Sequence, residues 1–297
     1  LGDVYKRQPH DQRSRELRIM NRVEFGAMGT RVTAVGQRVE RVARVFADAE
    51  AVFSRFDTSS ELSALNADWR YEVEVSPQLA TCLRAAADLR RRTGGLIDPA
   101  VGGTLIDWGY DRTFAEVADR SCVTPVRPVG RWSITGNVVH RAPGTRLDLG
   151  GIAKGWTADQ AVESGLADMV SAGGDVRSNL DEASAVIEDP WGHIAARVRL
   201  GRGGLATSSS TRRRWKVGDV DANHIIDPRR LGPAVSPIFS ATATAATATA
   251  AEAGAKAVLL HGEHGLVWAE KQEWINAALV VWHDGSVYAT TGWEMAA

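Results

Sequence analysis

Apolar residues recur along this chain with two different periods, and each period predicts a different kind of element. Residues 31–35 alternate between polar and apolar side chains, which predicts a strand. From residue 39 to residue 56 the apolar side chains recur at helical spacing, which predicts an amphipathic helix after that strand. A second helix is predicted to begin at Pro77, behind the N-cap residue Ser76, and to end at glycines 94–95.

The second half of the chain adds short strands, hairpins and two further helices. Alternating residues around glycine turns predict the hairpins, and helical spacing of apolar residues predicts the helices. The predicted elements are a hairpin over residues 131–141, a helix over 153–163, strands over 169–172 and 239–244, a helix over 250–260 capped by Thr249, and a terminal hairpin over 277–289. The predicted fold class is α/β, a mixed α+β arrangement of helices and antiparallel hairpins. No linker divides it, so we expect one domain over residues 21–297.

The first twenty residues are unlike the rest of the chain. Residues 1–20 are polar and contain no apolar segment, no cleavage pattern and no lipid-bearing cysteine, so we predict that they are disordered or not native to the domain. No stretch approaches the roughly 18 consecutive apolar residues of a spanning helix, so no transmembrane segment is expected. As the chain stands it is expected to be cytoplasmic, and an incomplete N-terminus would leave export open.

The bulk composition is typical of a soluble globular protein and argues against a nucleic-acid partner. The chain has 297 residues, of which 44% are hydrophobic and 24% charged, and its formal net charge is -1. A protein that binds nucleic acid carries a basic surface, which this charge balance does not provide. Cys82 and Cys122 are the only cysteines, and Cys82 falls on the apolar face of a predicted helix, so no disulfide framework is expected.

Candidate chemistry is concentrated in the sequence DLGGIAKG, residues 148–155. A glycine turn that opens a helix points backbone N–H groups outward, and Lys154 adds a full positive charge beside them. Such a site suits an anion, and a pyrophosphate is the first candidate. The same residues also suit a tight turn followed by a surface lysine, and this stretch alone does not decide between the two interpretations.

Other stretches, read in order and at their spacing, add to this one. They are FGAMGT at residues 25–30, SRFDTSSELSALN at 54–66, TGGLIDPAVGG at 93–103, WGY at 108–110, SAGGDV at 171–176, LATSSSTRRRW at 205–215 and HIIDP at 224–228. The set resembles the family of FAD:protein FMN transferases, the ApbE-like flavin transferases, over nearly the whole chain. The resemblance implies a single flavin-transferase domain that binds FAD and splits its pyrophosphate with the help of Mg²⁺. It would attach FMN to a Ser or Thr of a target flavoprotein and release AMP.

The resemblance also implies which residues form the site. The positions that match the family's FAD site are Met28, Phe56, Leu96, Ile97, Asp98, Asp148, Lys154 and Ile226. Gly151, through its carbonyl, and Glu252 match the metal ligands. His224 would lie near the acceptor hydroxyl, where a histidine with an ordinary, near-neutral pKa can take the proton.

Several of these residues also have a purely structural interpretation. Met28 and Phe56 suit a hydrophobic core, since Phe56 ends an apolar stripe. Asp98 suits the cap of a turn. His224 suits an imidazole that is hydrogen-bonded into the turn that follows it. Each residue is assigned to the site by its fit to the family pattern alone.

The chain departs from the family at the second metal motif, where the family reads A-D-A-x-x-T. Residues 251–256 read AEAGAK here, so Glu252 keeps a carboxylate but Lys256 replaces the threonine. In one explanation, Mg²⁺ binds more loosely through Glu252, the Gly151 carbonyl, water and substrate phosphates. In the other, the Lys256 ammonium stands about where the cation would and pairs with Glu252 one helical turn away.

Two alternative functions stay open beside the transferase. One is an FAD-binding protein without transfer activity, and the other is an FAD pyrophosphatase with water as the acceptor.

Overall fold

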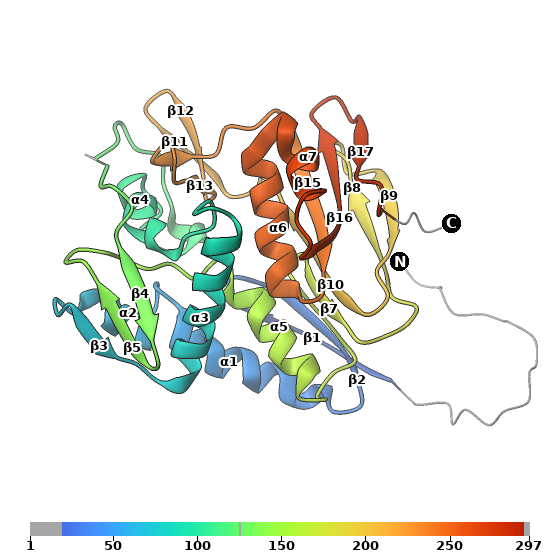
Figure 1. Ribbon diagram of the computed structural model, residues 1–297, viewed down its shortest axis with the longest axis horizontal. Coiled ribbons are helices and arrows are strands. Elements are labelled where there is room, and N and C mark those ends of the chain that lie inside the picture. The colour runs from blue at the N-terminus through green and yellow to red at the C-terminus, as the bar shows by residue number, and fades with distance from the viewer. Residues whose placement is uncertain (1–19, 125, 294–297) are drawn as a thin grey trace, which may run out of the picture.

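An antiparallel sheet of eight strands is the framework of the computed structural model, which describes residues 20–124 and 126–293 (Figure 1). In their order across the sheet the strands are β1 (Asn21–Ala27), β2 (Thr30–Gly36), β6 (Met169–Ala172), β7 (Asp175–Ser178), β10 (Gly203–Ser208), β15 (Ile238–Ala245), β16 (Ile275–Trp282) and β17 (Val287–Ala289). Each strand is antiparallel to its neighbours. The sheet therefore places the first strands of the chain beside strands from its middle.

Two helices pack against this sheet and against each other. Helix α5 (Ala153–Glu163) lies beside α6 (Ala248–His261), and α1 (Val42–Phe53) packs on α5 (Figure 1). Helix α6 is rich in alanine and buries nearly its whole circumference, as expected for a helix enclosed on all sides. A glycine is needed where the two helices meet, because a Cβ on Gly155 would lie 3.0 Å from the backbone of Ala248.

Smaller elements complete the molecule. The remaining helices are α2 (Glu61–Ala67), α3 (Pro77–Arg92), α4 (Gly102–Asp107) and α7 (Gly265–Ala269), with short 3-10 turns η1 (Val39–Arg41), η2 (Pro99–Val101), η3 (Phe114–Glu116) and η4 (Gly262–His264). A second sheet has the order β3 (Glu72–Glu74), β5 (Val138–Arg141), β4 (Trp132–Thr135), and two-stranded ribbons pair β8 (Ser184–Glu188) with β9 (Ile194–Arg199), β11 (Arg214–Val217) with β12 (Val220–Asn223), and β13 (Ile226–Asp227) with β14 (Gly232–Pro233). The second sheet and α3 share one apolar core, which includes Leu79, Leu83 and Val139.

Most elements predicted from the sequence are confirmed, and so is the mixed fold class. The elements found at their predicted places are β2, α3, α5, β6, β15, the hairpin of β4 and β5, and the terminal hairpin of β16 and β17. Helix α3 begins as predicted, because the Ser76 hydroxyl accepts the N–H of Leu79 and Pro77 stands in the first turn. Cys82 is buried, as its place in the apolar pattern predicts.

The helix predicted over residues 39–56 is too long. Helix α1 ends at Phe53, because Ser54 adopts an extended conformation. The Ser54 hydroxyl then accepts the backbone N–H groups of Phe56 and Asp57, which stabilises a turn instead of another helical turn. Phe56 therefore leaves the apolar stripe of the helix and takes a different direction.

Residues 1–19 lie outside the described part of the chain, so the prediction made for the N-terminal twenty residues stays a prediction. Among residues 20–124 and 126–293, no helix combines the length and the apolar character needed to cross a membrane.

The start of helix α6 differs from its prediction and is tied to α5 by one buried carboxylate. Thr247, not Thr249, is the N-cap, and its hydroxyl accepts the N–H of Ala250 at 3.1 Å. Asp159 of α5 accepts the N–H groups of Ala248 at 2.8 Å and of Thr249 at 3.0 Å, and it also accepts the Thr249 hydroxyl at 2.5 Å. A carboxylate at this helix end satisfies N–H groups that have no partner within the helix. Asp159 thus fixes the position of α6 relative to α5.

We expect Asp159→Ala to destabilise the fold by about 3 kcal/mol, because it leaves buried donors at the start of α6 without an acceptor. The free energy of unfolding from urea denaturation measures this loss. Glu163→Ala is the matched control, since Glu163 is an exposed carboxylate on the same helix, and it should change the stability by no more than about 0.5 kcal/mol. Equal effects of the two substitutions would show that Asp159 does not hold the helices together.

Candidate functional site

A cavity of about 660 Å³ brings together every site residue predicted from the sequence. Its lining includes Met28, Phe56, Leu96, Ile97, Asp98, Asp148, Gly151, Lys154, His224, Ile226 and Glu252. These residues come from the turn between β1 and β2, the segment after α1, the loop before η2, the start of α5, the segment before β13, and α6. The volume lies within the range of roughly 300–1,000 Å³ that is typical of pockets for small molecules and cofactors.

Met28 reaches the cavity from a tight turn. Its φ angle is 50° and that of Gly29 is 66°, so both central residues of the turn between β1 and β2 are in the left-handed region. This conformation is uncommon for a residue with a long side chain. Met28 also packs against two of the apolar cores. Met28 therefore packs against the core and lines the cavity at the same time.

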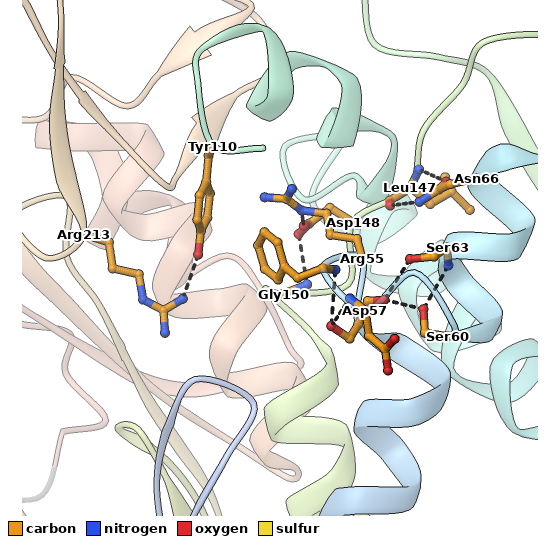
Figure 2. A network of polar contacts seen from close by, with 12 residues as sticks. Arg55, Asp57, Ser60, Ser63, Asn66, Tyr110, Leu147, Asp148, Gly150 and Arg213 are labelled. Atoms are coloured by element: carbon orange, nitrogen blue, oxygen red, sulfur yellow. Dashed lines mark hydrogen bonds and ion pairs between the residues drawn. The ribbon is translucent and has the colours of Figure 1, made fainter. Parts of the chain in front are cut away.

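A cationic and aromatic wall of side chains lines the cavity. Figure 2 shows Arg55, Tyr110 and Arg213 of this wall. The guanidinium of Arg55 lies 4.1 Å from the ring centroid of Phe56 and 4.7 Å from that of Tyr110. The two rings are themselves 5.4 Å apart. The Tyr110 hydroxyl accepts a hydrogen bond of 3.4 Å from Arg213. Planar faces and positive charge are the features that suit an aromatic ring carrying a phosphate.

Asp148 is held rigidly at the cavity rather than left free in the glycine turn. One of its carboxylate oxygens accepts the Gly150 N–H at 2.9 Å, and the other pairs with Arg55 (Figure 2). The preceding backbone is fixed by Asn66, which donates to the Leu147 carbonyl at 2.8 Å and accepts from the Leu147 N–H at 2.7 Å. In Arg55, Nη2 is buried and has no hydrogen-bond partner in the described part of the chain.

Asp98 has a structural function in this structure. Its carboxylate accepts hydrogen bonds from Arg90 at 2.6 Å, from the indole of Trp132 at 2.8 Å and from the Ala100 N–H at 2.9 Å. The last contact caps η2, as the turn-cap interpretation predicts. Asp98 therefore shapes the loop that lines the cavity.

Four charged side chains meet where α5 and α6 approach the start of β7. Nζ of Lys154 lies 2.8 Å from Oδ2 of Asp175 and 3.1 Å from Oε1 of Glu252. Lys256, one turn further along α6, lies 3.6 Å from the same Glu252 oxygen. All four side chains are at most 17% exposed. Buried charges of this kind are stable only when they are paired.

The pKa values of this cluster follow from burial and mutual attraction. Burial alone lowers the pKa of Lys154, but the carboxylates of Asp175 and Glu252 outweigh it and hold the pKa above its usual value. Burial and the charge of Glu252 raise the pKa of Asp175, and Lys154 opposes them. Burial also raises the pKa of Glu252, but the nearby lysines outweigh it, and its pKa lies below its usual value. Lys154 therefore stays charged in the cavity.

The predicted metal ligands do not fit a divalent cation as they stand. Lys256 Nζ lies 3.4 Å from the Gly151 carbonyl oxygen and 3.6 Å from Glu252, so the ammonium lies between the two groups that were expected to bind Mg²⁺. Residues 20–124 and 126–293 contain no group of three His, Cys, Asp or Glu side chains that could hold a metal ion. The pairing of Lys256 with Glu252 is the arrangement expected when an ammonium replaces the cation.

His224 lies at the cavity wall and is partly exposed. Its Nδ1 is buried without a hydrogen-bond partner among the described residues. Burial and the nearby ammonium of Lys256 lower the pKa of His224 to about 3, and two further cations add to this shift. The near-neutral pKa expected from the sequence is therefore wrong for the free protein. The imidazole is uncharged at neutral pH and can accept a proton.

Several residues of the cavity were not recognised as site residues from the sequence. Arg55, Tyr110, Asp175 and Arg213 line the cavity, and none of them was assigned to it. All four stand inside stretches that carried the family resemblance, so those stretches held the available signal. Their partners lie far away along the chain, so a pattern of neighbouring residues could not pair them.

The comparison with known proteins agrees with this fold. The sequence model of the ApbE family matches residues 28–279, and the chain belongs to this family. An FAD:protein FMN transferase of Rhodobacter capsulatus is 34% identical over 251 residues, which cover 77% of this chain and 48% of that protein. An FAD:protein FMN transferase of Treponema pallidum (strain Nichols) is 30% identical over 259 residues, which cover 75% of this chain and 71% of that protein. The chain thus spans about half the length of the first relative.

Solved structures share the fold along almost the whole chain. The ApbE protein of Thermotoga maritima has a TM-score of 0.79 at 25% identity, over 92% of this chain and 97% of that chain. The flavin transferase ApbE from Vibrio cholerae has a TM-score of 0.77 at 23% identity, over 93% of this chain and 98% of that chain. The arrangement of the eight-stranded sheet and its helices is therefore the ApbE fold.

The depressed pKa of His224 predicts a loss of stability in acid. Unfolded His224 binds a proton below about pH 6.5, whereas the folded imidazole does so only near pH 3. The unfolded state therefore gains protons first, and stability falls as the pH decreases through this window. Between pH 7 and pH 5 the wild type should lose about 2 kcal/mol more than His224→Gln.

Urea denaturation at each pH measures this difference. His264→Gln, which removes an exposed histidine, is the control and should follow the wild type. Parallel losses in the wild type and in His224→Gln would contradict the assignment of a depressed pKa to His224.

Proposed function

We propose that this protein transfers FMN from FAD to a Ser or Thr hydroxyl of an acceptor flavoprotein and releases AMP. The observation that carries the proposal is the convergence of all the predicted site residues on one cavity that also contains buried cations. Both relatives compared above carry the name FAD:protein FMN transferase, which supports the same conclusion. The proposal assigns FAD to the cavity as the substrate.

The distribution of charge in the cavity suits a dinucleotide. Lys154 at the start of α5 and Lys256 on α6 face the cavity together, and Arg55 and Arg213 line it as well. Cations and the N-terminal end of a helix stabilise a bound pyrophosphate. Phe56 and Tyr110 offer ring faces against which a flavin or an adenine can stack.

In the proposed reaction, one bond forms at phosphorus and one breaks. The acceptor hydroxyl oxygen attacks the phosphorus of the FMN half, and the bond from that phosphorus to the bridging oxygen of the pyrophosphate breaks. AMP leaves with the bonding electron pair, and FMN remains as a phosphoester on the acceptor. Lys154 stabilises the negative charge that develops on the pyrophosphate.

His224 receives the hydroxyl proton in this reaction and passes it to solvent. The free imidazole is neutral and has a buried Nδ1 without a partner among the described residues. Its basicity in the free protein is low, because burial and the surrounding cations lower its pKa to about 3. A bound pyrophosphate brings negative charge next to these cations, and that charge raises the pKa of the imidazole. Substrate binding thus makes His224 a better general base.

Incubating the protein with FAD and a peptide that carries a flavinylation Thr tests the proposal. We expect FMN-peptide and AMP in equal amounts, measured by mass spectrometry. Free FMN and AMP with an unmodified peptide would favour a pyrophosphatase, and intact FAD that stays on the protein would favour a binding protein without transfer. Either of these results would contradict the transferase.

Substitution of Lys154 tests the charge assignment. Lys154→Met should lower the rate of FAD turnover about 100-fold or more, because it removes the cation paired with Asp175 and Glu252. The control is Lys216→Met, because Lys216 is an exposed lysine on β11 outside the cavity lining. Thermal unfolding of both variants checks that each is folded. Full turnover by a folded Lys154→Met variant would remove Lys154 from the mechanism.

A further inference from the structure

The side chain of Lys256 lies in the cavity against Gly151 and Glu252. Its Nζ lies 3.4 Å from the Gly151 carbonyl oxygen and 3.6 Å from Oε1 of Glu252. A Cβ on residue 151 would lie 2.1 Å from this Nζ, so the glycine leaves the space that the ammonium fills. The ammonium is therefore fitted against the turn that opens α5.

The charges around Lys256 are already balanced. Two carboxylates, Asp175 and Glu252, face two ammonium groups, Lys154 and Lys256. A divalent cation added to this cluster would leave two uncompensated positive charges in a buried place, which costs free energy. Replacing Lys256 by a neutral residue would instead leave one negative charge in excess and would make the cluster attractive to a cation.

Lys256 retains access to the cavity. Its side chain is 17% exposed and belongs to the cavity lining. An ammonium has three N–H donors. Two of them can point to the Gly151 carbonyl and to Glu252. The third can point to a phosphate oxygen in the cavity.

We propose that the Lys256 ammonium does the work of a divalent cation in this protein and stabilises the pyrophosphate directly, so that FAD is split without a bound metal ion. This inference rests on the proposed function for its substrate. The bond that breaks is the one between the FMN phosphorus and the bridging oxygen. The electron pair stays on the AMP phosphate, where the Lys256 ammonium neutralises it, and the acceptor proton leaves through His224.

A metal-binding experiment tests the inference without any turnover. Mn²⁺ is titrated into the full chain in the absence of FAD, and bound Mn²⁺ is measured by electron paramagnetic resonance. We expect Lys256→Thr, which adds a neutral oxygen ligand and removes the positive charge, to bind one Mn²⁺ about tenfold or more tightly than the wild type. Lys216→Thr, an exposed control on β11, should bind like the wild type. Equal binding of Mn²⁺ by the wild type and Lys256→Thr overturns the inference.

An activity experiment distinguishes this inference from the proposed function. FAD turnover with the acceptor peptide is measured in EDTA and in Mg²⁺. The wild type should keep its rate within about twofold in EDTA, whereas Lys256→Met should lose about 100-fold in EDTA and recover part of this loss in Mg²⁺, because its cluster then attracts a cation. Wild-type transfer that EDTA abolishes overturns the inference and leaves the proposed function intact. If FAD is unchanged in every condition, the proposed function fails, and the Mn²⁺ titration still decides whether Lys256 closes the metal site.

Discussion

The pairing of Lys154 with two buried carboxylates is the interaction on which the site depends. Lys154 lies in the first turn of α5, Asp175 begins β7 and Glu252 lies in α6, so one ammonium connects three elements. None of these charges could be buried alone, because removing an unpaired ion from water costs several kcal/mol. The three elements must therefore dock together for any of the three charges to be tolerated. Lys256 extends the same cluster along α6 and completes its charge balance.

The contacts that hold the scaffold are also the ones that position the site. Asp159 binds the first N–H groups of α6, and Gly155 permits the close approach of α5 to Ala248. Both contacts fix α6 against α5, and they therefore fix the positions of Glu252 and Lys256 relative to Lys154. The pairing of Asp148 with Arg55 (Figure 2) places a guanidinium against the rings of Phe56 and Tyr110 in the same cavity. A change in the scaffold at any of these residues is therefore also a change in the site.

Much of the local structure was predictable because it depends on residues that are close in sequence. Ser76 and Pro77 define the start of α3. Glycines mark the turns that connect the strands of the hairpins. Both signals act through neighbouring residues alone. The predicted bounds were wrong at two helix ends, where a side chain forms hydrogen bonds that replace or alter those expected for the helix. Ser54 ends α1 early by accepting two N–H groups, and the start of α6 was misread because Asp159 draws Thr249 away from a capping role. Ser54 bonds to residues close to it in sequence. Asp159 lies on another helix, so the periodic pattern of α6 could not predict its contact with Thr249.

The sequence by itself determined most of the elements and the family resemblance. It offered the pairing of Lys256 with Glu252 as one of two explanations, since residues four positions apart on a helix are neighbours. Only the tertiary structure decided which partners Lys154 has, that Arg55 and Tyr110 share a wall, and that His224 has a depressed pKa. The physical reason is that these properties arise between segments far apart along the chain. Their charges and rings meet only after α5, α6 and the sheet have packed, and burial then changes the electrostatic cost of each group.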